Sequence, residues 1–145
     1  MSGNRRKARE FAVQGVYLWL LNQQPVNDVI KQLREDAAYQ EIDEAMFSKL
    51  LHGVVANVAE LDLRIAHFVD RPMAELSPVE HAVLLLGTQE LLHSLEVPYR
   101  VIINEAVELT KTFGGTDGHK YVNGVMDKIA AQVRSAEVNK PRAPK

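Results

Sequence analysis

Apolar residues recur at intervals of three and four along most of the chain, which is the spacing typical of amphipathic helices. The pattern begins near Arg5 and continues to Asn22, and Pro25 interrupts it. A short second helix is predicted next, with Asn27 or Asp28 as its N-cap residue. The alternating apolar and polar positions that predict strands are missing from the sequence.

Two helices in the middle of the chain carry the clearest boundary signals. The longest is predicted from Asp43 to about Val69, with apolar positions repeating at helical spacing throughout. The run Ser77-Pro78-Val79-Glu80 then combines a serine N-cap, a proline at the first helical position and a glutamate at the third, which together predict a capping box. Because the following helix is apolar nearly all round, it is expected to be central and buried on several sides.

The C-terminal third predicts two more helices and a tail. Pro98 separates the central helix from one that ends at Phe113, where Gly114-Gly115 is expected to act as a C-terminal glycine cap. The last helix starts near Asp117. Residues 135–145 hold two prolines and few apolar groups, and we expect them to form a flexible basic tail.

Six or seven helices with mostly short connections predict a compact all-α bundle, in one domain that covers residues 1–134. The composition agrees with this, since 46% of the 145 residues are hydrophobic and 25% are charged. No apolar run reaches the length of roughly 18–20 residues that spans a bilayer. The basic N-terminus lacks a signal-peptide cleavage pattern, so a cytoplasmic protein is expected.

The sequence indicates no catalytic site, metal or cofactor. The absence of cysteine excludes disulfides, thiolate catalysis and cysteine-ligated metals. The segment from Gly114 to Lys120 resembles a phosphate loop only superficially, because the lysine does not directly follow the second glycine of that motif and no strand precedes it. No serine lies in a nucleophile-elbow context, and the histidines lack metal-binding spacing.

Charge is distributed unevenly along a chain whose formal net charge is −2. The first nine residues contain no acid, and four of them are basic: Arg5, Arg6, Lys7 and Arg9. Guanidinium groups can bind phosphates bidentately and stack on unpaired bases, which suits single-stranded RNA. The alternatives are a frayed terminus without a partner, or a basic end that serves solubility.

Two aromatic residues are further candidates for binding. Tyr17 falls on the polar face of the first helix, where the core pattern does not explain it, so it either binds a partner or packs against a neighbouring loop. His119-Lys120-Tyr121 places a cation beside an aromatic ring at the start of the last helix, an arrangement compatible with a nucleotide contact.

Several segments, taken in order, resemble the bacterial transcription antitermination factor family NusB. The resemblance covers roughly residues 5–134 and rests on the following stretches: Arg5-Arg6-Lys7-Ala8-Arg9-Glu10, Val79-Glu80-His81-Ala82-Val83-Leu84, Val97-Pro98-Tyr99-Arg100 with Asn104-Glu105-Ala106, and His119-Lys120-Tyr121-Val122-Asn123-Gly124. It implies an all-helical fold of two packed helical subdomains. It also implies binding of the boxA element of nascent ribosomal RNA together with the small-subunit ribosomal protein NusE, alongside other Nus factors and RNA polymerase.

The resemblance also implies roles for individual residues. RNA contacts are expected at Arg5, Arg6, Lys7, Arg9, Asp117, Lys120 and Tyr121, and contacts with NusE at Tyr17 and Glu80. Lys7 stands where arginine is common and Tyr121 where phenylalanine is common, and Lys7 lacks the bidentate fork of arginine.

Two other functions fit the sequence less well. One is a helical protein–protein adaptor that does not bind RNA. The other is the RNA-binding part of a ribosomal RNA cytosine methyltransferase, which we do not expect because no catalytic domain follows in this sequence.

Overall fold

The computed structural model describes residues 3–114 and 117–140 and confirms the all-helical prediction. This part of the chain forms seven α-helices and two 3₁₀ helices and contains no strand: α1 (Arg5–Asn22), α2 (Val26–Leu33), η1 (Ala37–Glu41), α3 (Glu44–Phe68), η2 (Met73–Glu75), α4 (Pro78–His93), α5 (Tyr99–Phe113), α6 (Gly118–Val133) and α7 (Ser135–Val138). None of these helices is both long enough and apolar enough to cross a membrane.

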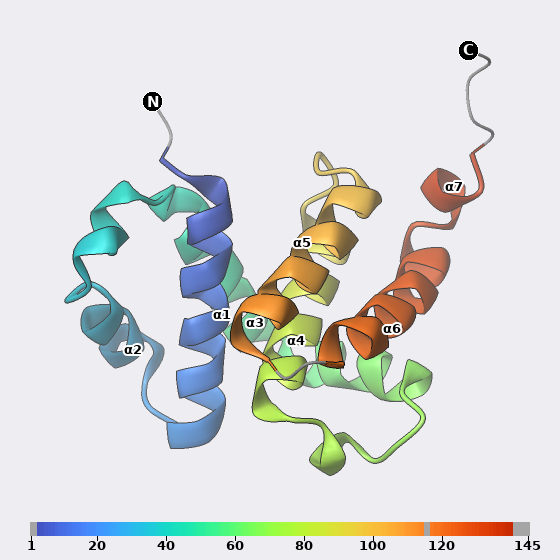
Figure 1. The fold of residues 1–145 in the computed structure, drawn as a ribbon, viewed down its shortest axis with the longest axis horizontal. Coiled ribbons are helices and arrows are strands. Elements are labelled where there is room, and N and C mark those ends of the chain that lie inside the picture. Colours follow the sequence, from blue (N-terminus) through green and yellow to red (C-terminus); the bar gives the residue numbers. More distant parts are fainter. Residues whose placement is uncertain (1–2, 115–116, 141–145) are drawn as a thin grey trace.

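The helices form two groups that share one core. In Figure 1, α1 and α2 lie on one side of the molecule, and α5, α6 and α7 lie on the other. The central helix α4 packs against α1, α3, α5 and α6, and α3 packs against α1, α4 and α6. One continuous cluster of buried apolar side chains runs through both groups, so the two halves are held together by a common hydrophobic core.

The central position of α4 confirms the prediction from its apolar sequence. Every residue from Ala82 to Leu91 is buried, and this stretch includes the polar residues Thr88, Gln89 and Glu90. A buried carboxylate is unfavourable unless a cation or several donors compensate it. Glu90 therefore requires a charged partner inside the fold.

The predicted N-cap of α2 is wrong. Neither Asn27 nor Asp28 caps α2, because that helix already begins at Val26, directly after Pro25. The proline takes the N-cap position, and its carbonyl oxygen accepts the first helical hydrogen bonds from the N–H groups of Asp28 and Val29.

The prediction that α5 ends at Phe113 with a glycine cap is confirmed, since Gly114 occupies the C-cap position. Gly114 is extended, with φ −102° and ψ −172°, and its N–H donates to the carbonyl oxygen of Thr110 at 2.7 Å. A Cβ at this position would lie 2.8 Å from that oxygen, so glycine is needed here for close approach rather than for left-handed backbone. Gly115 lies outside the described residues.

Arg134 closes the C-terminal end of α4. Its side chain is buried, and its guanidinium donates to backbone carbonyl oxygens of Leu91 at 2.9 Å, Val97 at 2.7 Å, Ser94 at 2.9 Å and Glu90 at 3.2 Å. The last carbonyls of a helix have no partner within the helix. Arg134 supplies those partners, with its own positive charge at the negative end of the helix dipole.

The chain continues as an ordered turn after Arg134, so the flexible tail predicted from residue 135 starts too early. Residues Ser135–Val138 form α7. The carboxylate of Glu137 accepts from the N–H of Tyr99 and from Arg134, each at 2.9 Å, and these two bonds lower the pKa of Glu137. They fix α7 against the start of α5. Residues 141–145 of the predicted tail lie outside the described residues.

We expect Arg134→Met to lower the free energy of unfolding by about 3–5 kcal/mol, because it leaves several buried carbonyl oxygens without donors. Urea denaturation followed by circular dichroism measures this change. Arg100→Met is the matched control, since Arg100 is exposed on α5, and it should change stability by less than about 0.5 kcal/mol. Equal effects of the two substitutions would contradict this account of Arg134.

Candidate nucleic-acid and protein interface

The first turn of α1 is attached to the chain segment that precedes α3. The side chain of Asn4 caps α1 by accepting from the N–H of Lys7 at 2.9 Å. The N–H of Asn4 donates to the carbonyl oxygen of Glu41 at 2.8 Å. The N–H of Asp43 donates to the carbonyl oxygen of Asn4 at 3.2 Å. The basic turn is therefore held in place from its first residue, and the frayed alternative does not apply to it.

Arg5 and Arg6 of this turn are exposed and Lys7 is half-buried, and the three cations have different neighbours. Nη2 and Nε of Arg6 donate to the two carboxylate oxygens of Glu105 at 2.7 and 3.3 Å, and this interaction raises the pKa of Arg6. Nζ of Lys7 lies 3.6 Å from a carboxylate oxygen of Glu41. Arg5 forms no ion pair with any residue in the described part of the chain. The expected cluster thus spreads around the end of α1.

Arg9 is buried, and the expectation that it stands free to contact RNA is wrong. Only 4% of the residue is exposed. Its Nε and Nη2 each lie 2.9 Å from a carboxylate oxygen of Glu90, and its Nη1 lies 3.5 Å from Glu105. Most donors of this guanidinium already face carboxylates inside the core, although Arg9 also borders a cavity that Arg5 and Arg6 line. The structure gives Arg9 the role of attaching the basic end of α1 to α4.

The two glutamates were not identified from the sequence, although one signal was available. Glu90 is the one charged residue in the stretch of α4 from Ala82 to Leu91, and a charge at such a position requires a buried partner. Glu105 gives a weaker signal because α5 is amphipathic, and only the packing of α5 on α1 shows that its side chain faces Arg6 and Arg9.

The second predicted cluster lies at the start of α6. Asp117 and Lys120 are exposed, and Tyr121 is half-buried. The Tyr121 hydroxyl donates to Asp70 at 3.2 Å, and the guanidinium of Arg71 lies 4.2 Å from the centre of its ring. Burial raises the pKa of Tyr121, while hydrogen bonds from Arg71 and Tyr121 lower that of Asp70. Arg71, which sequence reasoning missed, adds a cation to this cluster.

The structure does not bring the two predicted clusters together. In Figure 1, α1 begins near the N-terminal label at the top, whereas α6 begins low in the view, where α5 ends. An RNA strand that touches both clusters has to extend along the molecule. The two clusters therefore cannot bind a single phosphate together.

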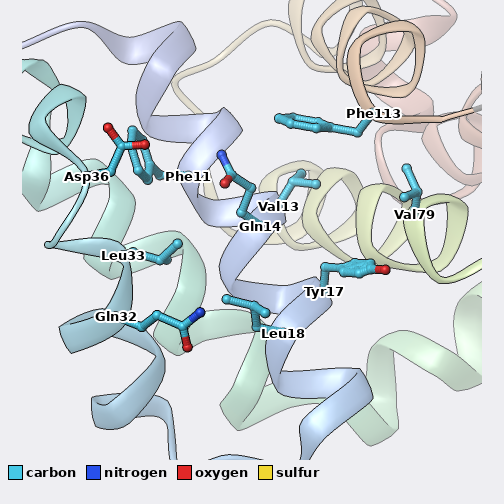
Figure 2. A pocket seen from close by; sticks show the side chains of 10 residues that line it. All are labelled: Phe11, Val13, Gln14, Tyr17, Leu18, Gln32, Leu33, Asp36, Val79 and Phe113. Carbon is cyan, nitrogen blue, oxygen red and sulfur yellow. The ribbon is translucent and has the colours of Figure 1, made fainter.

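Tyr17 borders a cavity of about 520 Å³ and is half-buried rather than free on a polar face. Figure 2 shows its ring pointing toward Val79 of α4, with Phe113 of α5 across the cavity. The remaining lining residues come from α1, α2 and the segment after α2: Phe11, Val13, Gln14, Leu18, Gln32, Leu33 and Asp36. The lining is mostly apolar, with a few polar groups, as in sites that accept an inserted side chain.

Glu80 confirms the predicted capping box and lies next to the second cluster. Its N–H donates to Oγ of Ser77 at 3.1 Å, and its Oε1 accepts from the Ser77 N–H at 3.2 Å. A Cβ added to Gly118 would lie 3.1 Å from its Oε2, which places the starts of α4 and α6 in contact. Val79, the residue before Glu80, lines the cavity at Tyr17, whereas Glu80 itself is not among the lining residues.

Within the described ranges, no three histidine, aspartate or glutamate side chains are placed to hold a metal ion. The charged groups at both clusters are instead arranged as ion pairs and exposed cations. Fold and surface together define a small all-helical protein with a basic cluster at the start of α1, a cluster of mixed charge at the start of α6, and a partly apolar cavity.

Comparison with known proteins identifies the family. The model of the NusB family matches residues 6–131, and the transcription antitermination protein NusB of Bordetella pertussis is 56% identical over 138 residues, covering 92% of this chain and 90% of the relative. The chain belongs to the NusB family. Its relatives are named as antitermination proteins, in agreement with the expectation of a function other than catalysis.

Solved structures show the same fold. Thermotoga maritima NusB superimposes with a TM-score of 0.81 at 26% identity, over 91% of this chain and 94% of that one. A crystal structure of antitermination factors NusB and NusE in complex with double-stranded RNA matches with a TM-score of 0.78, over 88% of this chain and 96% of that one. At 24% sequence identity, this similarity shows the fold alone.

We expect Arg9→Met to destabilise the protein by about 3–5 kcal/mol, because it leaves the carboxylate of Glu90 buried without its cation. The same substitution four residues earlier, Arg5→Met, removes an exposed charge and should cost less than about 0.5 kcal/mol. Urea denaturation of both variants measures the difference. Similar stabilities of the two variants would show that the buried pair does not support the fold.

Proposed function

We propose that this protein takes part in transcription antitermination by binding single-stranded boxA RNA together with the ribosomal protein NusE. The observation that carries the proposal is the basic end of α1, where exposed Arg5 and Arg6 and half-buried Lys7 lie on a turn that Arg9 and Glu90 attach to the core. The resemblance to NusB proteins and the names of the relatives supply the process.

Helix electrostatics supports a phosphate ligand at this end. The dipole of α1 disfavours cations at its N-terminus by about 0.3–1 kcal/mol each, and no acidic residue occupies the first turn to compensate. A bound phosphate would offset this repulsion and accept hydrogen bonds from the guanidinium groups. Three cations in such a place are easier to explain by an anionic ligand than by helix stability.

The neighbouring groove offers surface for an unpaired base. A cavity of about 360 Å³ lies between the start of α1, the α4–α5 connection and the start of α5. Its lining combines three guanidinium groups and three apolar residues with two carboxylates: Arg5, Arg6, Arg9, Val97, Pro98, Val101, Glu96 and Glu105. Apolar side chains beside guanidinium groups suit a nucleotide whose phosphate is bound and whose base is unstacked. This groove extends the RNA contact from α1 toward α5.

The second cluster would bind RNA farther along the strand. Lys120 supplies an exposed cation, and Tyr121 supplies an aromatic side chain that Asp70 and Arg71 hold in place. Asp117 can accept hydrogen bonds from ribose hydroxyl or base amino groups. Because this cluster lies at the far end of α5, its contribution requires an extended strand.

The cavity at Tyr17 supports the contact with NusE. A half-buried tyrosine beside an apolar cavity is typical of an anchor position in protein interfaces. Asp36 lies at the lining and Glu80 near it, so the rim is acidic and suits a basic partner, as ribosomal proteins generally are. A structure of the same fold contains NusE and RNA, which makes these the partners to test first.

In this proposal the protein works in the cytoplasm, without a cofactor, and reaches RNA polymerase and the other Nus factors through the RNA and NusE. The alternative is a protein–protein adaptor that uses the Tyr17 cavity and does not bind RNA. Gel mobility of boxA RNA separates the two functions, because an adaptor would retard the RNA only in the presence of NusE.

We expect the double substitution Arg5→Ala and Lys7→Ala to weaken binding of boxA RNA and to flatten its dependence on salt. Each lost contact with single-stranded RNA changes the log–log slope by about 0.7, so the slope should fall in magnitude by about 1.4. Fluorescence anisotropy across a salt series measures both quantities.

The matched control for this experiment is Lys31→Ala with Arg64→Ala, which removes two cations from α2 and α3, away from both clusters. The control should keep the wild-type slope. If both double variants flatten the slope equally, RNA responds to net charge alone and the basic end of α1 is not its site.

We expect Tyr17→Ala to weaken binding of purified NusE by at least about tenfold, since a buried aromatic anchor typically contributes 2 kcal/mol or more. Glu80→Gln keeps the hydrogen bonds of the capping box and tests the charge separately, and it should weaken binding less. Isothermal titration calorimetry measures both variants, with Leu63→Ala, an exposed position on α3, as the control. Unchanged affinity of the Tyr17 variant would exclude the cavity as the NusE site.

A further inference from the structure

Arg6 is an exposed cation of the basic turn whose guanidinium donors already bond to a carboxylate. Its Nη2 and Nε face the two oxygens of Glu105 at 2.7 and 3.3 Å. The Glu105 side chain is only 10% exposed and is therefore held in position, whereas the Arg6 side chain is 61% exposed. An approaching phosphate can reach Arg6, but it meets a carboxylate that already uses the same donors.

Other carboxylates strengthen this effect. Glu10 and Glu108 lie near enough to act electrostatically on Arg6, and together with Glu105 they line a small cavity of about 190 Å³ beside it. These negative charges repel a phosphate on the α5 side of Arg6. The cation is therefore available only to a ligand that compensates for this repulsion elsewhere.

Arg9 allows Glu105 to release Arg6. Nη1 of Arg9 lies 3.5 Å from Oε1 of Glu105, while its other donors remain on Glu90. Removing one partner from a buried carboxylate is strongly unfavourable when it leaves the charge alone. Here the guanidinium of Arg9 stays beside Glu105 after Arg6 has left. The carboxylate of Glu105 therefore keeps one cationic partner when Arg6 moves to a phosphate.

We propose that Glu105 competes with RNA phosphate for Arg6 and thereby acts as a specificity-determining residue for RNA binding. The inference rests on the proposed RNA-binding function. An RNA that touches the basic end at scattered phosphates gains little from Arg6, because it must first displace Glu105. An RNA that also contacts Arg5, Lys7 and the second cluster has enough other contacts to complete the exchange.

The first test compares Glu105→Gln with Glu108→Gln, which removes the same charge one turn further along α5 and has no hydrogen bond to Arg6. The probes are a boxA RNA and a 12-nucleotide single-stranded RNA of unrelated sequence. Glu105→Gln should tighten binding of the unrelated RNA about three- to tenfold and steepen its salt slope by about 0.7, and so reduce the preference for boxA. Glu108→Gln removes only a longer-range repulsion at Arg6, so it should tighten binding in the same direction but by less than about twofold.

The second test repeats Glu105→Gln in an Arg6→Ala background. If Glu105 acts through Arg6, more than half of the gain in affinity should disappear there. If Glu105→Gln is no tighter than Glu108→Gln, or if its gain persists without Arg6, the proposal is overturned. Wild-type protein that binds neither RNA would instead overturn the proposed function itself, and this inference with it.

A third measurement uses the wild-type protein and therefore does not depend on whether a variant folds. In nuclear magnetic resonance spectra, the Nε proton of Arg6 should exchange slowly with water in the free protein, because it is bonded to Glu105. Saturation with boxA RNA should break that bond and change the Arg6 Nε resonance while the Arg9 Nε resonance stays in place. An Arg6 proton that keeps its resonance and its protection at saturation contradicts the exchange.

Discussion

The buried pair between Arg9 and Glu90 is the interaction on which the binding surface depends. Both side chains are almost fully enclosed, at 5% and 3% exposure, so the loss of hydration must be offset by their mutual attraction and hydrogen bonds. The pair joins the first helix to the C-terminal part of α4. Because the carbonyl oxygen of Glu90 also accepts from Arg134, the same residue links the start of the chain to its C-terminal end.

Through this attachment, α1 is fixed to the core and contributes to two different surfaces, the basic end and the cavity at Tyr17. One stripe of the helix is buried in the core, while Arg5 begins its basic end and Tyr17 lies at the cavity further along. Twelve residues of helix separate these two positions, which corresponds to about 18 Å at 1.5 Å per residue. RNA and a protein partner can therefore occupy the same helix at the same time without sharing contacts.

Sequence reasoning recovered the helices but only part of the site. Periodicity and local capping signals, such as Ser77 with Glu80, fix helices because they depend on neighbours in the chain. The environment of a charged side chain depends on which helix faces it. From the sequence, all basic residues from Arg5 to Arg9 are therefore expected to be exposed. In the structure, packing against α4 and α5 buries Arg9 and pairs Arg6 with Glu105. The contact of Arg71 with Tyr121 could likewise not be predicted from the sequence, because only the packing of the helices brings these two residues together.

The central claim is that RNA binds at the fixed basic end of α1. Titration of the isotopically labelled full chain with boxA RNA, followed by backbone amide resonances, tests it most directly. The account predicts the largest changes at residues 3–8, a second set near residues 117–121, and little change along α2. Saturable RNA binding that leaves the amides of residues 3–8 unperturbed would contradict it.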